Sequence, residues 1–147
     1  MKRLIEQALK QYIEDDFDND FQIVLGTDNV TRDPPAIYIR TQSINQDDQL
    51  DALSTDREIN VTFSVVMSAD DKTPAEVQEA VQKLIALIDE LQDEEIDVED
   101  QGELYVRAAF TQDITQANED RLFTLDIDVL LVSALQIQIA EPEQPED

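Results

Sequence analysis

Apolar residues recur along this chain with two different periods, one typical of helices and one typical of strands. In residues 2–14 they lie three and four positions apart, which predicts an amphipathic helix that ends at the acidic run beginning with Glu14. Residues 73–76, with the sequence TPAE, combine an N-cap, a proline at the first helical position and a capping-box glutamate. An apolar stripe follows, so we expect a second helix from Pro74 to about Gln92.

The strand pattern is clearest in residues 58–67, where apolar and polar residues alternate. One wet face is typical of an antiparallel sheet and not of a parallel sheet that is covered on both sides. Short apolar runs in residues 21–27 and 36–41, separated by Pro34-Pro35, predict two earlier strands. Alternation returns in residues 104–110 and 123–131, which predicts two closing strands joined by a turn around residues 116–120.

These elements predict an α+β fold in the order α-β-β-β-α-β-β. We expect an antiparallel or mixed sheet of about five strands packed by two helices. Residues 1–133 would form a single domain, and residues 134–147 a C-terminal arm and acidic tail. The predicted core consists of Leu4, Leu9, Ile59, Val61, Phe63, Val65, Val81, Leu84, Ile88, Phe123, Leu125 and Ile127.

Two segments are candidates for contact with a partner. The polar stretch from Gln42 to Thr55 is interpreted as a long loop that becomes ordered in an assembly, and Leu50 and Leu53 are the large apolar residues that we expect it to offer to a neighbour. Near the C-terminus, the apolar parity of the last strand continues at three further positions. These complete the interface candidates, which are Leu50, Leu53, Leu135, Ile137 and Ile139.

The last strand also raises a problem of length. A single strand from Leu122 to Ile139 would run about 59 Å at ~3.3 Å per residue, longer than a small sheet usually pairs. We therefore expect its second half to overhang. Residues Ala134–Ala140 would then be an arm that pairs with an adjacent subunit by strand addition, or a segment that folds back on its own sheet.

The amino-acid composition excludes several classes of catalytic and metal-binding site. The 147 residues include 35 acidic and 10 basic side chains, giving a formal charge of −25, and there is no histidine or cysteine. Common zinc sites, catalytic triads and thiol chemistry are therefore excluded, and we expect a non-enzymatic protein without a cofactor. Specific nucleic-acid binding and membrane association are not expected of so acidic a chain, and no signal peptide or long apolar run is present, so we expect a soluble protein made inside the cell.

Two acidic clusters have a functional and a structural interpretation. The run Asp93–Glu103 could bind calcium, but it does not match an EF-hand loop and is more typical of a solvated connector. Asp126 and Asp128 lie on one face of the last strand, as a hydrolytic carboxylate pair would. Since about a quarter of the chain is acidic, a polar sheet face explains this spacing equally simply.

The arrangement of elements resembles the tail terminator, or tail-completion, proteins of tailed bacteriophages. The resemblance is carried by the helix LIEQALKQYI, the strand REINVTFSVVM, its continuation into TPAEVQEAVQKLIALIDEL, and the closing strand RLFTLDIDVLLVSA. It covers nearly the whole chain as a pattern of elements and includes no diagnostic motif. The strongly acidic balance and the C-terminal extension depart from the pattern.

The resemblance implies a structural virion subunit in the tail or neck, made in the host cytoplasm and assembled into a homo-hexameric ring. Such a ring caps the tail tube and joins it to the head-tail connector or stopper protein, and DNA passes through it. A negative lumen would keep DNA from adhering to the wall. Another neck or connector subunit, an acidic DNA mimic that inhibits a nucleic-acid-binding protein, and a salt-adapted protein remain as alternatives.

Overall fold

The computed structural model describes residues 2–17, 21–46, 56–70, 73–119 and 121–137. The predicted α+β class and the alternation of helices and strands are confirmed, with one strand more than expected. In chain order the elements are α1 (Lys2–Glu14), β1 (Gln22–Leu25), the 3₁₀ turn η1 (Gly26–Asp28), β2 (Ala36–Gln46), β3 (Asp56–Ser68), α2 (Pro74–Asp89), β4 (Glu95–Val98), β5 (Gly102–Glu119) and β6 (Leu122–Ile137).

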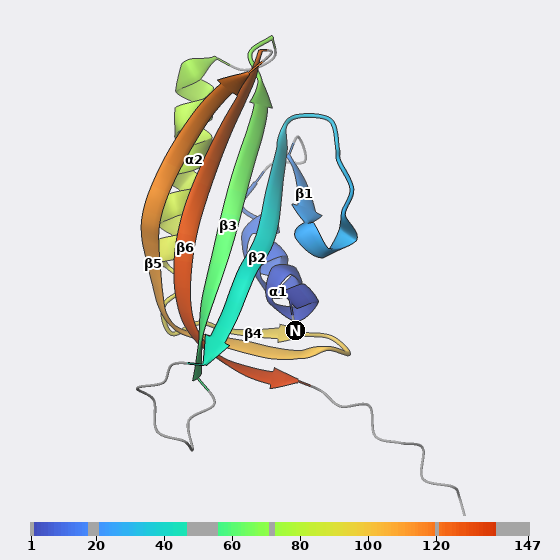
Figure 1. The fold of residues 1–147 in the computed structure, drawn as a ribbon, viewed down its shortest axis with the longest axis vertical. Coiled ribbons are helices and arrows are strands. Elements are labelled where there is room, and N and C mark those ends of the chain that lie inside the picture. The colour runs from blue at the N-terminus through green and yellow to red at the C-terminus, as the bar shows by residue number, and fades with distance from the viewer. Residues whose placement is uncertain (1, 18–20, 47–55, 71–72, 120, 138–147) are drawn as a thin grey trace, which may run out of the picture.

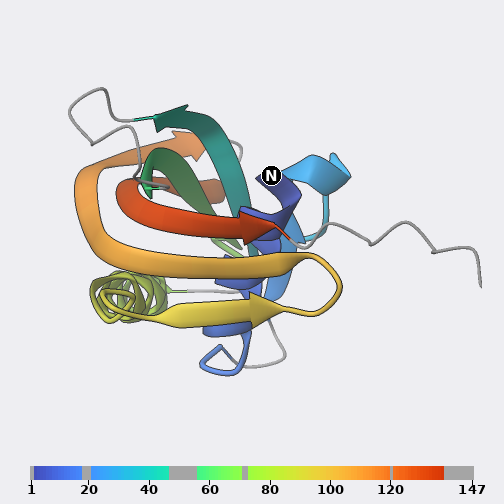
Figure 2. The same cartoon turned by 90° about the horizontal axis from the view of Figure 1, so that it is seen from below.

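The strands form one mixed sheet in the order β1-β2-β3-β6-β5-β4. β1 runs parallel to β2, and every other neighbouring pair is antiparallel. Both helices lie on the same face of the sheet, α2 behind β5 and β6 and α1 behind β2 (Figure 1). Seen from below, one end of β5 and β6 curves under the helices toward β4 (Figure 2). The sheet therefore wraps around its helices and leaves its opposite face, the outer face, uncovered by any described element.

The hydrophobic core fills the space between the helices and the inner face of the sheet. The predicted core residues are all buried except Phe123 and Leu125, which are partly buried and pack against the core. The odd-numbered apolar residues of β3 point inward, and Phe63 is completely buried among them. Period-two alternation therefore identified the correct face of this strand.

α2 begins as its sequence predicts. The Thr73 hydroxyl accepts a hydrogen bond from the Glu76 backbone N–H at 3.2 Å. The Glu76 carboxylate accepts one in return from the Thr73 backbone N–H at 3.4 Å, and Pro74 occupies the first turn. This capping box satisfies two helix-end donors, so the start of α2 is fixed by local sequence alone.

A buried carboxylate joins α1 to the sheet. Glu6 is only 1% exposed, and its two oxygens accept hydrogen bonds from the backbone N–H groups of Thr27 (2.8 Å) and Thr41 (3.0 Å). These donors lie just beyond the last paired residues of β1 and β2, where the parallel ladder ends. Gly26 allows the close approach there, because a Cβ atom would lie 2.9 Å from Arg40 Cγ. Glu6 thus takes the place of the next ladder bonds.

Three predicted boundaries are wrong. Residues 42–46, expected as loop, extend β2, and only residues 47–55 of that segment lie outside the described residues. A β-bulge at Gln42 shifts the inward phase from Thr41 to Ile44, which hid the strand from a period-two pattern. The turn expected around residues 116–120 is also tighter, because β5 reaches Glu119 and β6 starts at Leu122. The end of β5 is solvent-exposed, so no apolar alternation marks it.

The third correction concerns the acidic connector. Within the run Asp93–Glu103, residues Glu95–Val98 form β4, which pairs antiparallel with the start of β5. Ile96 and Val98 are buried in the core, while the acidic residues between and around them face outward. Two inward side chains were too few to stand out among so many carboxylates.

Candidate functional site

The outer face of the sheet has a polar centre built from β3 and β6. The Thr62 hydroxyl donates a hydrogen bond to Asp128 at 2.8 Å, and the Ser64 hydroxyl donates one to Asp126 at 2.6 Å. Gln42 of β2 adds a donor to the Thr62 hydroxyl at 3.4 Å. The carboxylate pair is therefore held by neutral hydroxyl groups across neighbouring strands.

This arrangement matches a polar sheet face more closely than a hydrolytic centre. Among the residues that the structure describes, no group of three or more His, Cys, Asp or Glu side chains is placed to hold a metal ion. Asp113 of β5 stands opposite Asp128 in the ladder, so a third carboxylate adds negative charge to this face. Both predicted aspartates do lie on the same face, as the alternation indicated.

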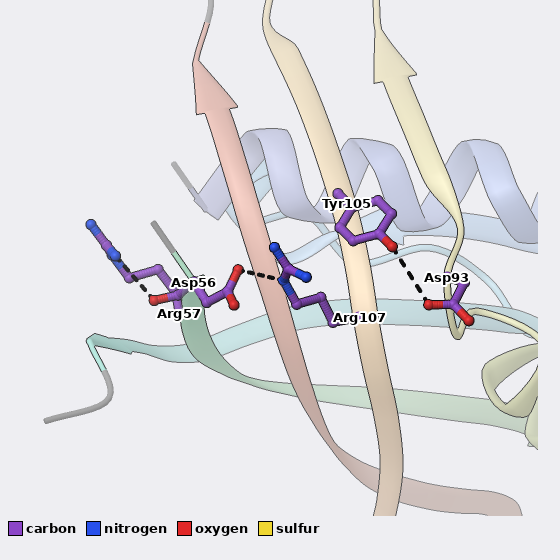
Figure 3. A network of polar contacts seen from close by, with 5 residues as sticks. All are labelled: Asp56, Arg57, Asp93, Tyr105 and Arg107. Carbon is purple, nitrogen blue, oxygen red and sulfur yellow. Dashed lines mark hydrogen bonds and ion pairs between the residues drawn. The ribbon is translucent and has the colours of Figure 1, made fainter. Parts of the chain in front are cut away.

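A network of polar contacts crosses the outer face at the bend of β5 (Figure 3). Arg107 donates from Nε to Asp56 Oδ1 at 2.8 Å, which links β5 to the start of β3 over the intervening β6. The guanidinium also lies 5.4 Å from the centroid of the Tyr105 ring, and the Tyr105 hydroxyl donates to Asp93 at 3.5 Å. The hydrogen bond and charge of Asp56 raise the pKa of Arg107. Arg107 is the bulged residue of β5, so the network lies at the point where the strand bends.

Next to this network lies an apolar patch. Ala108 and Phe110 of β5 stand opposite Val132 and Leu130 of β6 on the outer face. Phe110 is 55% exposed, which is unusual for a large aromatic side chain in a chain with only eight aromatic residues. An exposed aromatic beside partly buried aliphatic residues is typical of a surface that a protein partner covers.

Two strand edges border the outer face. β4 pairs with β5 only up to Tyr105, and backbone bonds from Asp93 and Glu94 extend this to Val106. On the other side, β1 pairs with β2 only up to Ile39. Among the described residues, no strand pairs with β5 beyond that point, or with β2 beyond Ile39, on the side facing away from the sheet centre. Glu6 occupies the backbone N–H of Thr41, so the edges open to a further strand are β5 beyond Val106 and β2 beyond Thr41.

A groove lies on the inner side of the sheet, between α2, the end of β5 and the start of β6. Its apolar lining comes from the helix and the sheet, and its polar rim consists of glutamines; the residues are Pro74, Val77, Gln78, Val81, Gln82, Gln116, Phe123 and Leu125. Phe123 and Leu125, the two predicted core residues that are not fully buried, therefore line this groove. An apolar groove beside an open strand edge adds to the surface available to a partner.

The β4–β5 hairpin carries a dense acidic surface. Asp97 stands opposite Glu103 in the ladder, and Glu95 lies one position further along the same face. A hydrogen bond with Glu95, together with its charge, raises the pKa of Glu103. Like charges on neighbouring positions of paired strands repel one another, and this acidic hairpin surface disfavours anionic partners.

Of the five interface residues predicted from the sequence, the structure describes two, Leu135 and Ile137. Leu50, Leu53 and Ile139 lie outside the described residues. Leu135 pairs with Leu104 in the sheet and packs, partly buried, against the core, while the backbone of Ile137 pairs with Gly102. A role for these residues between subunits stays a prediction.

The expected overhang of the last strand is wrong for residues 134–137, which pair with β5 of the same chain. β6 can be this long because its partner β5 is longer still, and bulges at Arg107 and Gln112 let both strands bend together around the core. The predicted boundary after Ser133 thus falls inside β6. The wider division into a domain at residues 1–133 and a terminal arm and tail stays a prediction.

Sequence reasoning missed the open edges, the apolar patch and the Arg107 network. Each depends on which strands are neighbours, and strand order is not visible in a single sequence. The one available signal is Phe110, the last apolar residue of an alternating run; the alternation predicts a strand and does not indicate that this side chain is exposed.

Comparisons with known proteins show a likeness of fold and none of sequence. No protein-family model matches the sequence, and no curated protein sequence is significantly similar to it. Among solved structures, the fold is similar to that of a chain from the virion of a native gene transfer agent particle. The two chains share 10% sequence identity with a TM-score of 0.60, over 90% of this chain and 96% of the other. At this identity the likeness shows that the fold is shared across nearly the full length of both chains.

Proposed function

We propose that this protein is a non-enzymatic structural subunit of a phage-like virion, and specifically a tail terminator. In this role a homo-hexameric ring of the chain caps the tail tube and joins it to the head-tail connector or stopper protein. The observation that supports the proposal is the near full-length likeness of fold to a chain of a gene transfer agent virion. The likeness is informative because it covers 90% of this chain and 96% of the other.

The chemistry of the surface supports the same proposal. The carboxylates of the outer face are held by hydroxyl groups, and the exposed features are an apolar patch and open strand edges. These are features of a protein that binds other proteins. A charge of −25 also suits a ring around DNA, since electrostatic repulsion keeps the polyanion from adhering to the wall.

Deleting the gene for this chain from the genome that encodes the particle tests the proposal. We expect electron microscopy to show complete heads and separate tails that fail to join, and expression of the chain in trans should restore joined particles. Complemented particles labelled on the chain should carry the label at the head-tail junction. Intact, infectious or transfer-competent particles after deletion would contradict the proposal.

The DNA-mimic alternative rests on charge alone. It expects a monomer or dimer that competes with DNA for a nuclease or another DNA-binding protein. Competition that depends on the acidic hairpin around Glu103, together with normal particles after deletion, would favour it over the virion role.

A further inference from the structure

We propose that copies of this chain join by strand addition, with the open edge of β5 in one copy pairing with the open end of β2 in the next. The segments involved are Ala108–Gln112 and Gln42–Gln46, called here the two edge segments. The choice of a second copy as the partner rests on the ring assembly proposed above. The contact itself is argued from pairing, charge and register.

Within the described part of the chain, neither edge segment has a strand partner along its outward side. The outward N–H and C=O groups of an edge strand can template another strand, and native proteins usually block such edges with charges, proline or a covering element. Neither edge segment contains a charged residue or a proline, and no described strand or helix pairs with them from outside. The bulge in each segment bends the edge without introducing a charge.

The charge distribution favours a second copy over a basic partner. Charged residues make up 31% of the chain, so ten residues would carry about three charges, and the two edge segments together carry none. Two copies with −25 each repel wherever acidic surfaces meet, and they can approach closely only through neutral surface. A cationic partner would instead be attracted to the acidic surface, such as the β4–β5 hairpin.

Strand direction allows the pairing. β2, β3, β6 and β5 alternate in direction from one strand to the next, so β2 and β5 run in opposite directions. A copy related by rotation about an axis roughly along the strands therefore presents its β2 antiparallel to β5 of the first copy. The new pair continues the antiparallel pattern of the sheet.

The register places the two edge segments at the same height. Asn45 is in line with Ala108 through the pairs Asn45–Glu58, Glu58–Val132 and Val132–Ala108. Ser43 is in line with Phe110 through Asn60 and Leu130 in the same way. Pairing then needs no shift along the strand axis, and a head-to-tail contact without a shift closes a ring instead of a filament. β1 covers the other half of the β2 edge, which confines the contact to these segments.

Cysteine crosslinking tests the contact directly, because the chain has no native cysteine. Within one chain, Asn45 and Ala108 are three strand spacings apart, about 14 Å at ~4.8 Å per spacing. A disulfide needs Cα atoms within about 7 Å. Any disulfide in the Asn45→Cys/Ala108→Cys double variant must therefore join two molecules.

We expect the double variant to give a ladder of covalent multimers under mild oxidation, and each single variant to stay monomeric under denaturing electrophoresis. The control is the Asn45→Cys/Ala86→Cys variant, since Ala86 is exposed on α2 and is not part of either edge segment. A ladder of equal intensity in the control would show random collision and overturn the proposal. Strong dimers from Ala108→Cys alone would show β5 pairing with β5, and would also overturn it.

A second measurement needs no cysteine. Phe110→Glu places a carboxylate on an exposed side chain of the β5 edge segment, and we expect the multimeric fraction in sedimentation to fall at least tenfold. Leu122→Glu, at an exposed site at the start of β6, is the matched control and should leave that fraction unchanged. Equal multimer fractions for Phe110→Glu and the unmodified chain would contradict the contact.

The outcomes separate this contact from the proposed virion role. A covalent ladder with normal particles after gene deletion would retain the contact and reject the tail role. Unjoined heads and tails after deletion, without a ladder from the double variant, would retain the tail role and reject this contact.

Discussion

Replacing Glu6 should destabilise the fold more than its position on a short N-terminal helix suggests. Its carboxylate is 1% exposed and accepts two backbone hydrogen bonds, from Thr27 at 2.8 Å and Thr41 at 3.0 Å. A hydrogen bond to a charged group contributes about 1.5–3 kcal/mol, and a buried donor left without a partner costs a similar amount. Glu6→Ala removes both bonds, so we expect a loss of about 3–5 kcal/mol.

Glu6→Gln separates geometry from charge. The amide has nearly the same shape, but only its oxygen can accept, so one of the two backbone N–H groups faces an NH₂ group. We expect this variant to lose about 1.5–3 kcal/mol, between the native protein and Glu6→Ala. The order of the three proteins is the specific consequence of a two-acceptor role.

Urea unfolding followed by circular dichroism measures these differences at fixed pH and salt. The control is Glu14→Ala, because Glu14 is exposed at the end of the same helix and should change stability by less than about 0.5 kcal/mol. Losses below that value for both Glu6 variants would refute the argument that this carboxylate closes the β1–β2 ladder.

Three further outcomes follow from packing and charge. Phe63→Ala and Leu84→Ala each remove a completely buried side chain, and each should lower the free energy of unfolding by about 2–5 kcal/mol. Losses under about half a kcal/mol at both sites would show that the core is misassigned. Gly26→Ala would put a Cβ atom 2.9 Å from a β2 side chain and 3.2 Å from a β2 carbonyl, so its melting temperature should fall, and an unchanged value would show that β1 can move. The pKa of Glu103 is raised, first by its hydrogen bond with Glu95, so the folded state keeps this proton to higher pH than the unfolded chain does. Its contribution to stability therefore declines as pH rises through the titration of Glu103. Glu103→Gln should melt higher than the native protein at pH 7 and no higher at pH 3 or in high salt, and a gain that persists at pH 3 would rule out charge repulsion.

The elements that could be predicted from the sequence are those whose signals are local. The capping box at Thr73 and Glu76 fixes the start of α2 through neighbouring residues, and the alternation in β3 reports burial because both neighbours of that strand continue the sheet. In these places sequence periodicity and tertiary burial describe the same surface.

In other strands, bulges and curvature that depend on the neighbouring strands decide which residues face inward. The bulges at Gln42, Arg107 and Gln112 change which residues face inward, so a fixed period of two fails beyond each of them. Residues 134–137 were expected to overhang because a straight strand of that length finds no partner. β5 is longer than β6 and bends with it, and the curved pair of strands wraps the core instead of extending past it.

The open strand edges were harder to predict, because they are defined by the absence of a neighbouring strand among the described residues. A segment such as Ala108–Gln112 is unremarkable in sequence and becomes informative only when no neighbour pairs with it. Asp126 and Asp128, which drew attention as possible catalytic groups, are explained by the hydroxyl groups of Ser64 and Thr62 on the adjacent strand.

The effect of salt on binding distinguishes the two main interpretations of this acidic chain, which are a self-assembling subunit and a DNA mimic. If copies assemble through neutral edge segments, their acidic surfaces repel one another, and added salt screens that repulsion and strengthens the assembly. If the chain imitates DNA, its carboxylates attract a basic partner, and the same salt weakens the complex. A charge of −25 is compatible with both roles, but its contribution to binding has the opposite sign in each. Only self-assembly explains why the edge segments Ala108–Gln112 and Gln42–Gln46 carry no charge. A DNA mimic binds through its carboxylates, so uncharged strand edges would not strengthen its binding.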